Sequence, residues 1–334
     1  MKLTVTIKDV AREAGVSIST VSRVINNSKP VSNEIRQKVL EVIKRTGYVP
    51  NPVARSLVTK KSQTIGVIVP DMSNLFIGEL INGIEEVGRI YNYDILLCNS
   101  YGTEEEEFRY INLLKSKQVA GLVFVSWNMT EKQVKAIEES NIKAVYISKN
   151  AKDFDVYSVG INHFDASYET TKHLLEKGLR KILFIRSSIE NTIADSERFK
   201  GYKKALKEYD IEVDKDYVKQ GDMTSSCGYE IMKKVLENYT PEAVFATNDE
   251  LAIGVMNAIL DKGLDVPKDI SVVGYDDTRI ASLTRPKLTT VRQPIYDIGA
   301  VCIRMLVKVL AGEEISDKRV ELPYKLVLRD SVID

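Results

Sequence analysis

The chain has 334 residues, of which 44% are hydrophobic and 28% charged, and its 47 basic residues balance 47 acidic ones. This length predicts two or three domains, and the composition is that of a globular protein with a buried core. No apolar run reaches the length of a membrane span, and the first residues lack the apolar segment of a secretory signal. Three separated cysteines, Cys98, Cys227 and Cys302, are interpreted as buried free thiols. We therefore expect a cytoplasmic protein.

The charge is unevenly distributed along the chain. Residues 1–61 contain 12 lysines and arginines against four acidic residues, a net charge of +8, and the rest of the chain carries −8. A basic head on an acidic body attracts a polyanion to one end only. The distribution favours a head that binds nucleic acid.

The head begins with TIKDVAREAGVSISTVSRVIN, residues 6–26, whose apolar spacing predicts two short helices separated by Gly15. Ser17 is placed to cap the second helix. A third helix is expected from about residue 32 to 45. The predicted buried positions of the three helices are Ile7, Val10, Ala11, Ala14, Val21, Val24, Ile25, Ile35, Val39, Leu40, Val42 and Ile43.

The outer face of the second helix carries side chains that suit DNA. Arg23 can bond bidentately to guanine, Ser19 can bond to a base edge, and Ile18 can touch a thymine methyl group. Ser22 shares this surface. Phosphate oxygens suit the flanking residues Thr6, Ser17, Thr20 and Asn26. The alternative is a solvated helical cap with an ordinary surface arginine, and the local charge of +8 weighs against it.

A proline-bounded segment, YVPNPVARSLVTKKSQ (residues 48–63), follows the head. Asn51 is a good helix cap and Pro52 suits the first helical position. The helix that they begin is only one or two turns long, and isolated helices this short are marginal in water. We expect it to form only when something holds it.

From Thr64 onward, apolar strands alternate with helical segments, which predicts parallel sheets buried on both faces. Two such halves leave a crevice at the carboxyl ends of their strands. No GxGxxG or GxxxxGK[ST] motif supports nucleotide binding. The predicted strands are 64–70, 93–99, 120–126 and 143–148 in the first half, and 181–187, 217–222, 243–249 and 270–277 in the second.

The head and the linker, TIKDVAREAGVSISTVSRVIN and NPVARSL, closely resemble the LacI/GalR family of bacterial transcription regulators, and the resemblance runs from about Thr4 to Leu328. It implies a helix-turn-helix head and a core similar to the periplasmic binding proteins. It also implies a homodimer on a pseudo-palindromic operator. By position, Ile18, Ser19 and Arg23 match base-reading residues. The hinge helix is matched by Asn51, Ala54, Arg55 and Leu57, with Leu57 as the minor-groove wedge; alternatively, Leu57 docks on the body.

The same resemblance places candidate ligand contacts in the crevice. Arg198 and Asp276 match residues that hold a ligand in other members, and Asp71, Asn248 and Asp249 follow other strands. A guanidinium, carboxylates and an amide suit the hydroxyls of a polyol. The same groups could equally form an ion-pair network that sets the closure of the two halves.

The helix IYDIGAVCIRMLVKVL (residues 295–310) carries Arg304 and Lys308 one turn apart, a good clamp for phosphate unless they are a routine surface pair. Residues 285–308 resemble the catabolite-control branch of the family, from low-GC Gram-positive bacteria, which binds the serine-phosphorylated phosphocarrier HPr or a homologue. The resemblance assigns the partner contacts to Tyr296, Asp297, Val301, Arg304 and Lys308, with Glu85, Glu86, Arg89 and Ile90 on a first-half helix. This chain departs from the branch pattern at Cys302, Ile303, Met305 and Val307; Val307 replaces a hydroxyl-bearing residue. The branch needs no cofactor, and fructose 1,6-bisphosphate and glucose 6-phosphate act as secondary effectors.

We predict three regions: a DNA-binding head (1–48), a hinge (49–63) and a two-subdomain core (64–334). The N-subdomain comprises about 64–162 and 292–322, and the C-subdomain about 163–291 and 323–334. The predicted function is an HPr-dependent regulator, mainly a repressor, of carbon-catabolite genes. The alternative is a repressor controlled by a sugar or sugar phosphate in the crevice, without HPr. A secreted binding protein would not need the head, and an enzyme finds no support because His163 and His173 lack metal-ligand or nucleophile partners.

Overall fold

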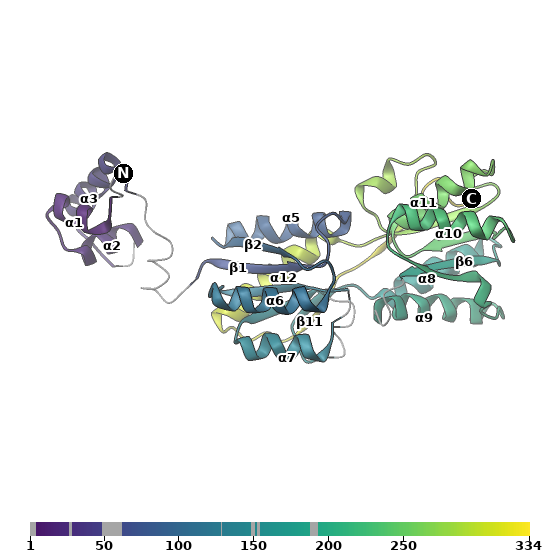
Figure 1. The fold of residues 1–334 in the computed structure, drawn as a ribbon, viewed down its shortest axis with the longest axis horizontal. Helices are drawn as coiled ribbons and strands as arrows, with labels where there is room; N and C mark the ends of the chain where they lie inside the picture. Colours follow the sequence, from purple (N-terminus) through teal and green to yellow (C-terminus); the bar gives the residue numbers. More distant parts are fainter. Residues whose placement is uncertain are drawn as a thin grey trace. The chain divides into compact units, whose positions relative to one another are not determined.

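The computed structural model describes residues 5–26, 29–48, 62–127, 129–147, 151, 154–187 and 193–334. The chain divides into two compact units, Met1–Ser62 and Gln63–Asp334. In its described part, the first unit consists of helices α1 (Ile7–Ala14), α2 (Ile18–Asn26) and α3 (Asn33–Thr46), drawn in purple in Figure 1. This is the helical head that the sequence predicts.

The head is built around a small apolar cluster. Val10, Val21 and Val39, one from each helix, have no exposed surface. Gly15 ends α1 with φ 66°, a left-handed conformation that glycine adopts without a steric penalty. The helix boundaries and the glycine stop are therefore confirmed.

The prediction that Leu40 belongs to the core of the head is wrong. Leu40 is 49% exposed, whereas its neighbour Val39 is buried. Successive residues of an α-helix lie about 100° apart around the axis, so Leu40 faces away from the contact that Val39 and Val42 make with α1 and α2.

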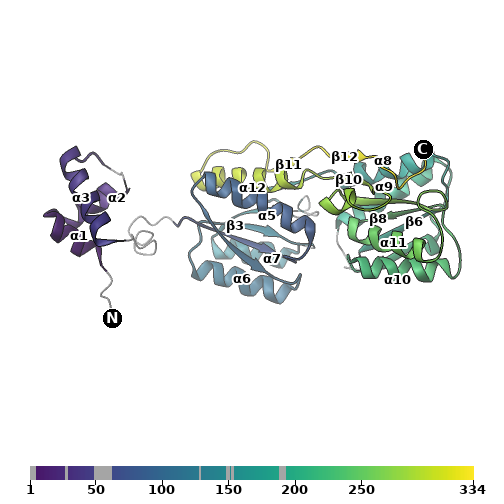
Figure 2. The same cartoon turned by 90° about the horizontal axis from the view of Figure 1, so that it is seen from above.

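The second unit contains two lobes, each built on a six-stranded sheet. In the first lobe all neighbouring strands are parallel, in the order β11-β5-β4-β3-β1-β2. Helices α5 and α12 cover one face of this sheet and α6 and α7 the other (Figures 1 and 2). The elements are β1 (Thr64–Val69), α5 (Leu75–Ile90), β2 (Asp94–Asn99), α6 (Glu104–Ser116), β3 (Gly121–Val125), α7 (Glu131–Ser140), β4 (Lys143–Ile147), β5 (Ser158–Gly160), α12 (Ile295–Ala311) and β11 (Arg319–Glu321).

The second lobe repeats this plan in the order β12-β10-β9-β8-β6-β7. Helices α8 and α9 cover one face and α10 and α11 the other. The elements are α8 (His163–Glu176), β6 (Ile182–Ser187), α9 (Ile193–Glu208), η2 (Lys215–Tyr217), β7 (Val218–Gly221), α10 (Ser225–Leu236), β8 (Ala243–Ala246), α11 (Asp249–Asp261), β9 (Ser271–Asp276), η3 (Arg279–Ser282), β10 (Thr289–Arg292) and β12 (Lys325–Val327).

Each strand predicted from an apolar run is present, and the α/β fold class is confirmed. Two details differ. The segment predicted over 243–249 ends as a strand at Ala246, because Asn248 caps α11 by accepting a hydrogen bond from the Leu251 amide. Strand β12 runs antiparallel to β10, so the second sheet is not wholly parallel.

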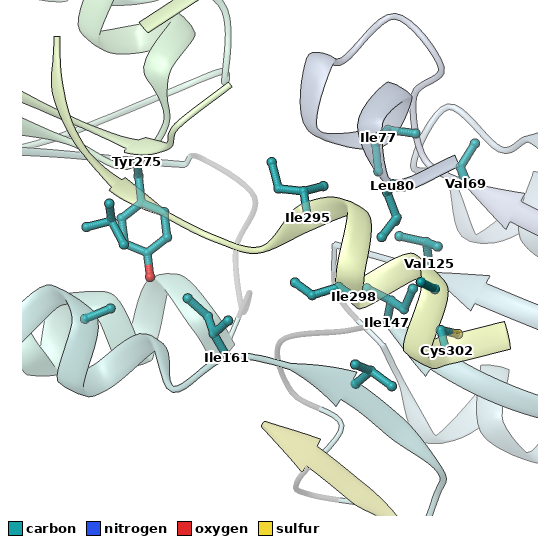
Figure 3. Packing of buried hydrophobic residues seen from close by; sticks show 14 of the residues in the cluster. Val69, Ile77, Leu80, Val125, Ile147, Ile161, Tyr275, Ile295, Ile298 and Cys302 are labelled. Atoms are coloured by element: carbon teal, nitrogen blue, oxygen red, sulfur yellow. The ribbon is translucent and has the colours of Figure 1, made fainter. Parts of the chain in front are cut away.

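The chain passes between the lobes at three places: after β5, after β10 and between β11 and β12. Apolar residues at these crossovers join the two cores. Figure 3 shows Ile161, Ile295 and Ile298 between Tyr275 of the second lobe and Val125 of the first. The lobes therefore share one continuous packed region beside the crossovers.

The three cysteines are free thiols, as predicted. Cys98 and Cys302 are buried, but Cys227 is only half-buried, so the expectation of burial is wrong for this residue. Cys227 lies in the first turn of α10, where its side chain packs beside Gly221 at the end of β7.

Candidate functional site

The second helix of the head presents a polar, positively charged surface. Ser17 caps α2, accepting a hydrogen bond from the Thr20 amide at 3.1 Å. Ile18 is 45% exposed, Ser19 and Arg23 are also exposed, and Ser22 is half-buried. In the described part of the head, Arg12 and Arg45 pair with acids, whereas no ion pair includes Arg23. A guanidinium in this setting is available for a base or a phosphate.

The residues predicted to contact phosphates differ in their hydrogen-bond partners. Thr6 begins α1, and both its amide and its hydroxyl donate to Asp9 Oδ2, at 3.0 and 2.7 Å. These hydrogen bonds hold the pKa of Asp9 below its usual value. Ser17 and Thr20 share a hydroxyl–hydroxyl hydrogen bond of 2.8 Å. The side chain of Asn26 and the hinge residues Asn51, Ala54, Arg55 and Leu57 lie outside the described residues.

Helices α5 and α12 of the first lobe pack directly against each other through glycines. A Cβ atom on Gly83 would lie 2.1 Å from the Tyr296 carbonyl oxygen, and one on Gly299 would lie 2.4 Å from the Leu80 carbonyl oxygen. Only glycine permits this approach of the two backbones. The two helices predicted to contact a protein partner therefore form one continuous surface.

The polar side chains of this surface meet across the helix pair. The Tyr296 hydroxyl of α12 donates to Glu86 Oε2 of α5 at 2.9 Å, and this hydrogen bond raises the pKa of Tyr296. Arg89 pairs with Glu85 within α5 at 3.9 Å. The remaining predicted contacts are the exposed Asp297, Arg304 and Lys308, the half-buried Val301, and Ile90, which is 69% exposed.

Val307, the departure that removes a hydroxyl from the branch pattern, is half-buried and packs against the first-lobe core. Arg304 and Lys308 are fully on the outer face of α12, whereas Val307 lies between that face and the core. Its methyl groups add to the packing of α12.

Four of the five predicted crevice residues are buried in the second lobe. Arg198 is 1% exposed; it donates to the Thr247 carbonyl at 2.6 Å, and its guanidinium lies 3.8 Å from the centre of the Tyr275 ring. The Asn248 amide nitrogen donates to the Met223 carbonyl at 2.9 Å. Asp276 accepts from Gln293 Nε2 at 2.6 Å. Arg198, Asn248 and Asp276 thus form hydrogen bonds with other residues of the protein near the strand ends.

The carboxylate of Asp249, one of these four residues, is buried and hydrogen-bonded. Its carboxylate accepts hydrogen bonds from the Thr278 amide and hydroxyl and from the Thr290 hydroxyl, at 2.7, 2.9 and 2.6 Å. Burial, followed by the nearby charge of Asp276, raises the pKa of Asp249 to about 8. Asp249 therefore ties α11 to β10 and to the turn after β9.

A cavity of about 740 Å³ lies between the lobes, at the carboxyl ends of their strands. We call it the interlobe cavity. Of the five predicted crevice residues only Asp71 lines it. Its other titratable and aromatic lining residues come from both lobes and are Tyr101, Glu104, Glu107, Trp127, Asp222 and Glu250.

Apart from Asp71, sequence reasoning missed the carboxylates that line this cavity. Asp222 directly follows β7, and Trp127 lies two residues after the end of β3, so the rule that places ligands at strand ends applies to both. Glu107 is 2% exposed, and burial raises its pKa to about 7. The sequence does not indicate this burial, because Glu107 is one of four consecutive glutamates, a pattern typical of a solvent-exposed first helical turn.

The described residues contain no cluster of histidines, cysteines and carboxylates that could hold a metal ion. None of the described helices is long and apolar enough to span a membrane. Both histidines lie on α8, where His163 Nδ1 is 2.9 Å from the buried Tyr275 hydroxyl.

Comparison with known proteins identifies the family. Residues 6–51 match the model for bacterial regulatory proteins of the lacI family, and residues 171–332 match a periplasmic binding protein-like domain. The chain is 41% identical over 330 residues to catabolite control protein A of Priestia megaterium, covering 98% of this chain and 99% of that protein. It is 42% identical over 328 residues to the HTH-type transcriptional regulator RegA of Clostridium saccharobutylicum, with the same coverage.

Comparison with solved structures gives the same family. The lac repressor dimer bound to operator and an anti-inducer matches with a TM-score of 0.90 and 28% identity, covering 99% of each chain. The transcription regulator CcpA of Lactococcus lactis matches with a TM-score of 0.75 and 30% identity, covering 81% of this chain and 99% of that one. The chain thus belongs to the lacI family of DNA-binding transcription regulators, and the relatives to which it is similar include catabolite control proteins.

Proposed function

We propose that this protein is a dimeric, sequence-specific regulator, mainly a repressor, of carbon-catabolite genes, and that serine-phosphorylated HPr activates it. The observation that carries the proposal is the continuous α5–α12 surface. Its exposed cations, Arg304 and Lys308, lie one helical turn apart, beside the Tyr296–Glu86 hydrogen bond. Relatives named catabolite control protein A, similar over nearly the whole chain, support the same function.

The proposed partner fits the charges of this surface. A phosphoserine carries a charge of about −1.5 to −2 and three strong acceptor oxygens. Arg304 and Lys308 can donate to these oxygens, and Ile90 offers an exposed apolar contact at the end of α5. Unphosphorylated HPr lacks the charge that these cations would neutralise, so it should bind weakly.

DNA is proposed to bind through α2 and the hinge. Arg23 and Ser19 would read base edges in the major groove while Ser17 and Thr20 contact phosphates. Two hinge helices, ordered side by side in the dimer, would then place Leu57 in the minor groove. Docking of HPr on the first lobe would favour the conformation in which the hinges order, and operator DNA must strengthen HPr binding by the same factor.

A double substitution tests the partner surface directly. Arg304→Ala with Lys308→Ala should abolish binding of serine-phosphorylated HPr, measured by titration calorimetry on the full chain without DNA. Lys262→Ala, outside this surface at the end of α11, is the matched control and should leave binding unchanged. Equal affinity of the double variant and the unsubstituted protein for phosphorylated HPr would refute the proposal.

The interlobe cavity favours a second candidate, a repressor that responds to a small molecule without HPr. Its volume is in the range of sites for small ligands. The two candidates separate in one comparison, because only the first requires Arg304 and Lys308 for the regulated change in operator affinity.

A further inference from the structure

We propose that two side chains of the second lobe, Glu250 and Arg292, hold the start of α5 to that lobe and transmit docking on the α5–α12 surface to the angle between the lobes. We call this pair of residues the latch. The inference rests on the proposed function, because it names the residues through which the partner surface would act on the rest of the core. Three features of the structure support it: the capping of α5, an ion pair at the end of β10, and the rigid link from there to the docking surface.

The start of α5 is capped in part by a residue of the other lobe. Asn74 caps α5 from within the first lobe, accepting hydrogen bonds from the amides of Phe76 and Ile77 at 3.0 and 3.3 Å. The Leu75 amide instead donates to the carboxylate of Glu250, in the first turn of α11. Amides of a first helical turn have no partner within the helix and attract negative charge. Glu250 therefore satisfies a backbone donor of the first lobe with a charge from the second.

This contact favours the arrangement in which the lobes are together. Burial raises the pKa of Glu250, the charges of Asp71 and Asp276 raise it further, and the hydrogen bond from the Leu75 amide lowers it. Glu250 and Asn74 both line the interlobe cavity, so the contact lies where the lobes meet. The hydrogen bond forms only while the lobes are close, and it offsets part of the cost of burying this carboxylate.

The second contact involves the last residue of β10. Arg292 Nε donates to Asp277 Oδ2 at 2.6 Å, and Arg329 donates to the other oxygen of the same carboxylate, also at 2.6 Å. The Asp277 side chain is only 4% exposed. Arg292 precedes the crossover from β10 to α12, and Arg329 follows the crossover from β11 to β12. Asp277 therefore joins the second-lobe ends of two crossovers.

Arg292 is attracted to carboxylates of both lobes. Glu79 lies on α5, one turn after its first residue. Burial raises the pKa of Glu79, the charge of Asp277 raises it further, and the charge of Arg292 lowers it. The Arg292 side chain is 53% exposed, so it can adjust its position between the two carboxylates. Its charge thus links α5 to β10.

The rest of α5 connects the latch to the docking surface. The helix has 16 residues, and its length is therefore about 24 Å. Its other end carries Glu86 and Ile90, two of the predicted partner contacts. The close approach at Gly83 and Gly299 leaves no room for α5 and α12 to slide past each other, so we expect the pair to move as one body. A shift produced by a partner at one end of α5 would then reach the latch at the other end.

The fluorescence of Trp127 tests the latch without HPr or DNA. Trp127, the only tryptophan, lines the interlobe cavity together with residues of both lobes, so acrylamide should quench it more strongly when the lobes separate. Glu250→Ala and Arg292→Ala should each raise the quenching constant of the full-length protein by roughly 1.5- to 3-fold, because each removes a contact that favours closed lobes. Glu250→Gln and Arg292→Lys retain part of each contact and should give intermediate values.

Two exposed residues of the second lobe provide matched controls. Lys325 lies opposite Arg292 in the pairing of β12 with β10, and Glu237 lies at the end of α10. Lys325→Ala and Glu237→Ala should leave the quenching constant unchanged. Equal quenching of the latch variants and the controls would overturn the proposal. The conservative variants Glu250→Gln and Arg292→Lys keep the test decisive if an alanine variant does not fold.

A second measurement tests transmission. Serine-phosphorylated HPr should bind the latch variants within about threefold of its affinity for the unsubstituted protein, by calorimetry without DNA, because the latch lies outside the docking surface. Its tightening of operator binding should nevertheless fall by roughly threefold or more. Undiminished tightening in the latch variants would overturn the proposal. If phosphorylated HPr has no effect on operator binding by the unsubstituted protein, the proposed function fails, and the quenching of Trp127 separately decides whether the latch holds the lobes.

Discussion

The environment of Glu107 departs from what its sequence context indicates. It belongs to a run of four glutamates at the start of α6, yet only this one is buried. Ser126 Oγ donates to its carboxylate at 3.1 Å, and Gln133 Nε2 donates to its other oxygen. Burial raises its pKa to about 7 in spite of these hydrogen bonds, which favour the charged form.

This burial predicts a pH dependence of stability. Because the folded protein holds the Glu107 proton more tightly than the unfolded chain does, the free energy of unfolding should fall as the pH rises from about 4.5 to above 7. The contribution of Glu107 is about 3 kcal/mol. Glu107→Gln should flatten this part of the profile, and Glu105→Gln should not. Urea unfolding followed by the fluorescence of Trp127, the only tryptophan, measures both; parallel profiles for wild type and Glu107→Gln would contradict the assignment.

Substitution of Arg23 should reduce the specificity of DNA binding at a single base pair of each half-site. Arg23→Ala should cost roughly 1–3 kcal/mol at one base pair of each half-site and little elsewhere. Titration of duplexes that vary one base pair at a time measures this pattern, with Lys38→Ala as the head control on α3. A uniform loss across all duplexes would instead mean that Arg23 contacts a phosphate.

At the scale of elements, the pair of α5 and α12 depends on close backbone approach. The carbonyl of Tyr296 occupies the space in which Gly83 would carry a Cβ atom. Gly78, on the same helix, has no atom within 4 Å of its Cβ position. The two glycines therefore have different roles despite their similar sequence context.

This difference predicts opposite results for one substitution. Gly83→Ala should destabilise the protein by about 1–3 kcal/mol because the helices must separate, and it should weaken binding of phosphorylated HPr. Gly78→Ala should be neutral or stabilise by up to about 1 kcal/mol through helix propensity. Denaturation and calorimetry check both. Equal destabilisation by the two variants would show that the close approach at Gly83 has little energetic weight.

Elements with a strong pattern could be predicted, and short ones could not. Near-continuous apolar runs identify β1 and β9 because both faces of these strands are buried. Strands β5, β11 and β12 have three residues each and carry too little periodicity to stand out. They are fixed by pairing with distant segments at the crossovers.

The candidate sites likewise divide into those that the sequence pattern predicts and those that it does not. The exposed faces of α2 and α12 were predictable, because helical spacing alone determines which residues share a surface. The crevice between the two halves was also predictable, but most of its lining residues were not, because they depend on which strand ends meet across two sheets. Arg198 and Asp249 are polar residues near strand ends, and only the packed structure shows that they point into the second lobe.

At the scale of the whole molecule, the proposed function requires that events on the core alter DNA binding by the head. The three crossovers and the shared apolar cluster join the two lobes. Docking on the α5–α12 surface and filling of the interlobe cavity would act on the same conformational equilibrium. Each can shift it only by its difference in affinity between the two states.

The most direct measurement is a titration of the full-length protein with an operator selected from random duplexes, at fixed salt, with phosphorylated or unphosphorylated HPr. The account predicts that serine-phosphorylated HPr tightens operator binding by roughly 5- to 150-fold and that unphosphorylated HPr leaves it unchanged. Operator affinity that is the same in both mixtures and without HPr would contradict it.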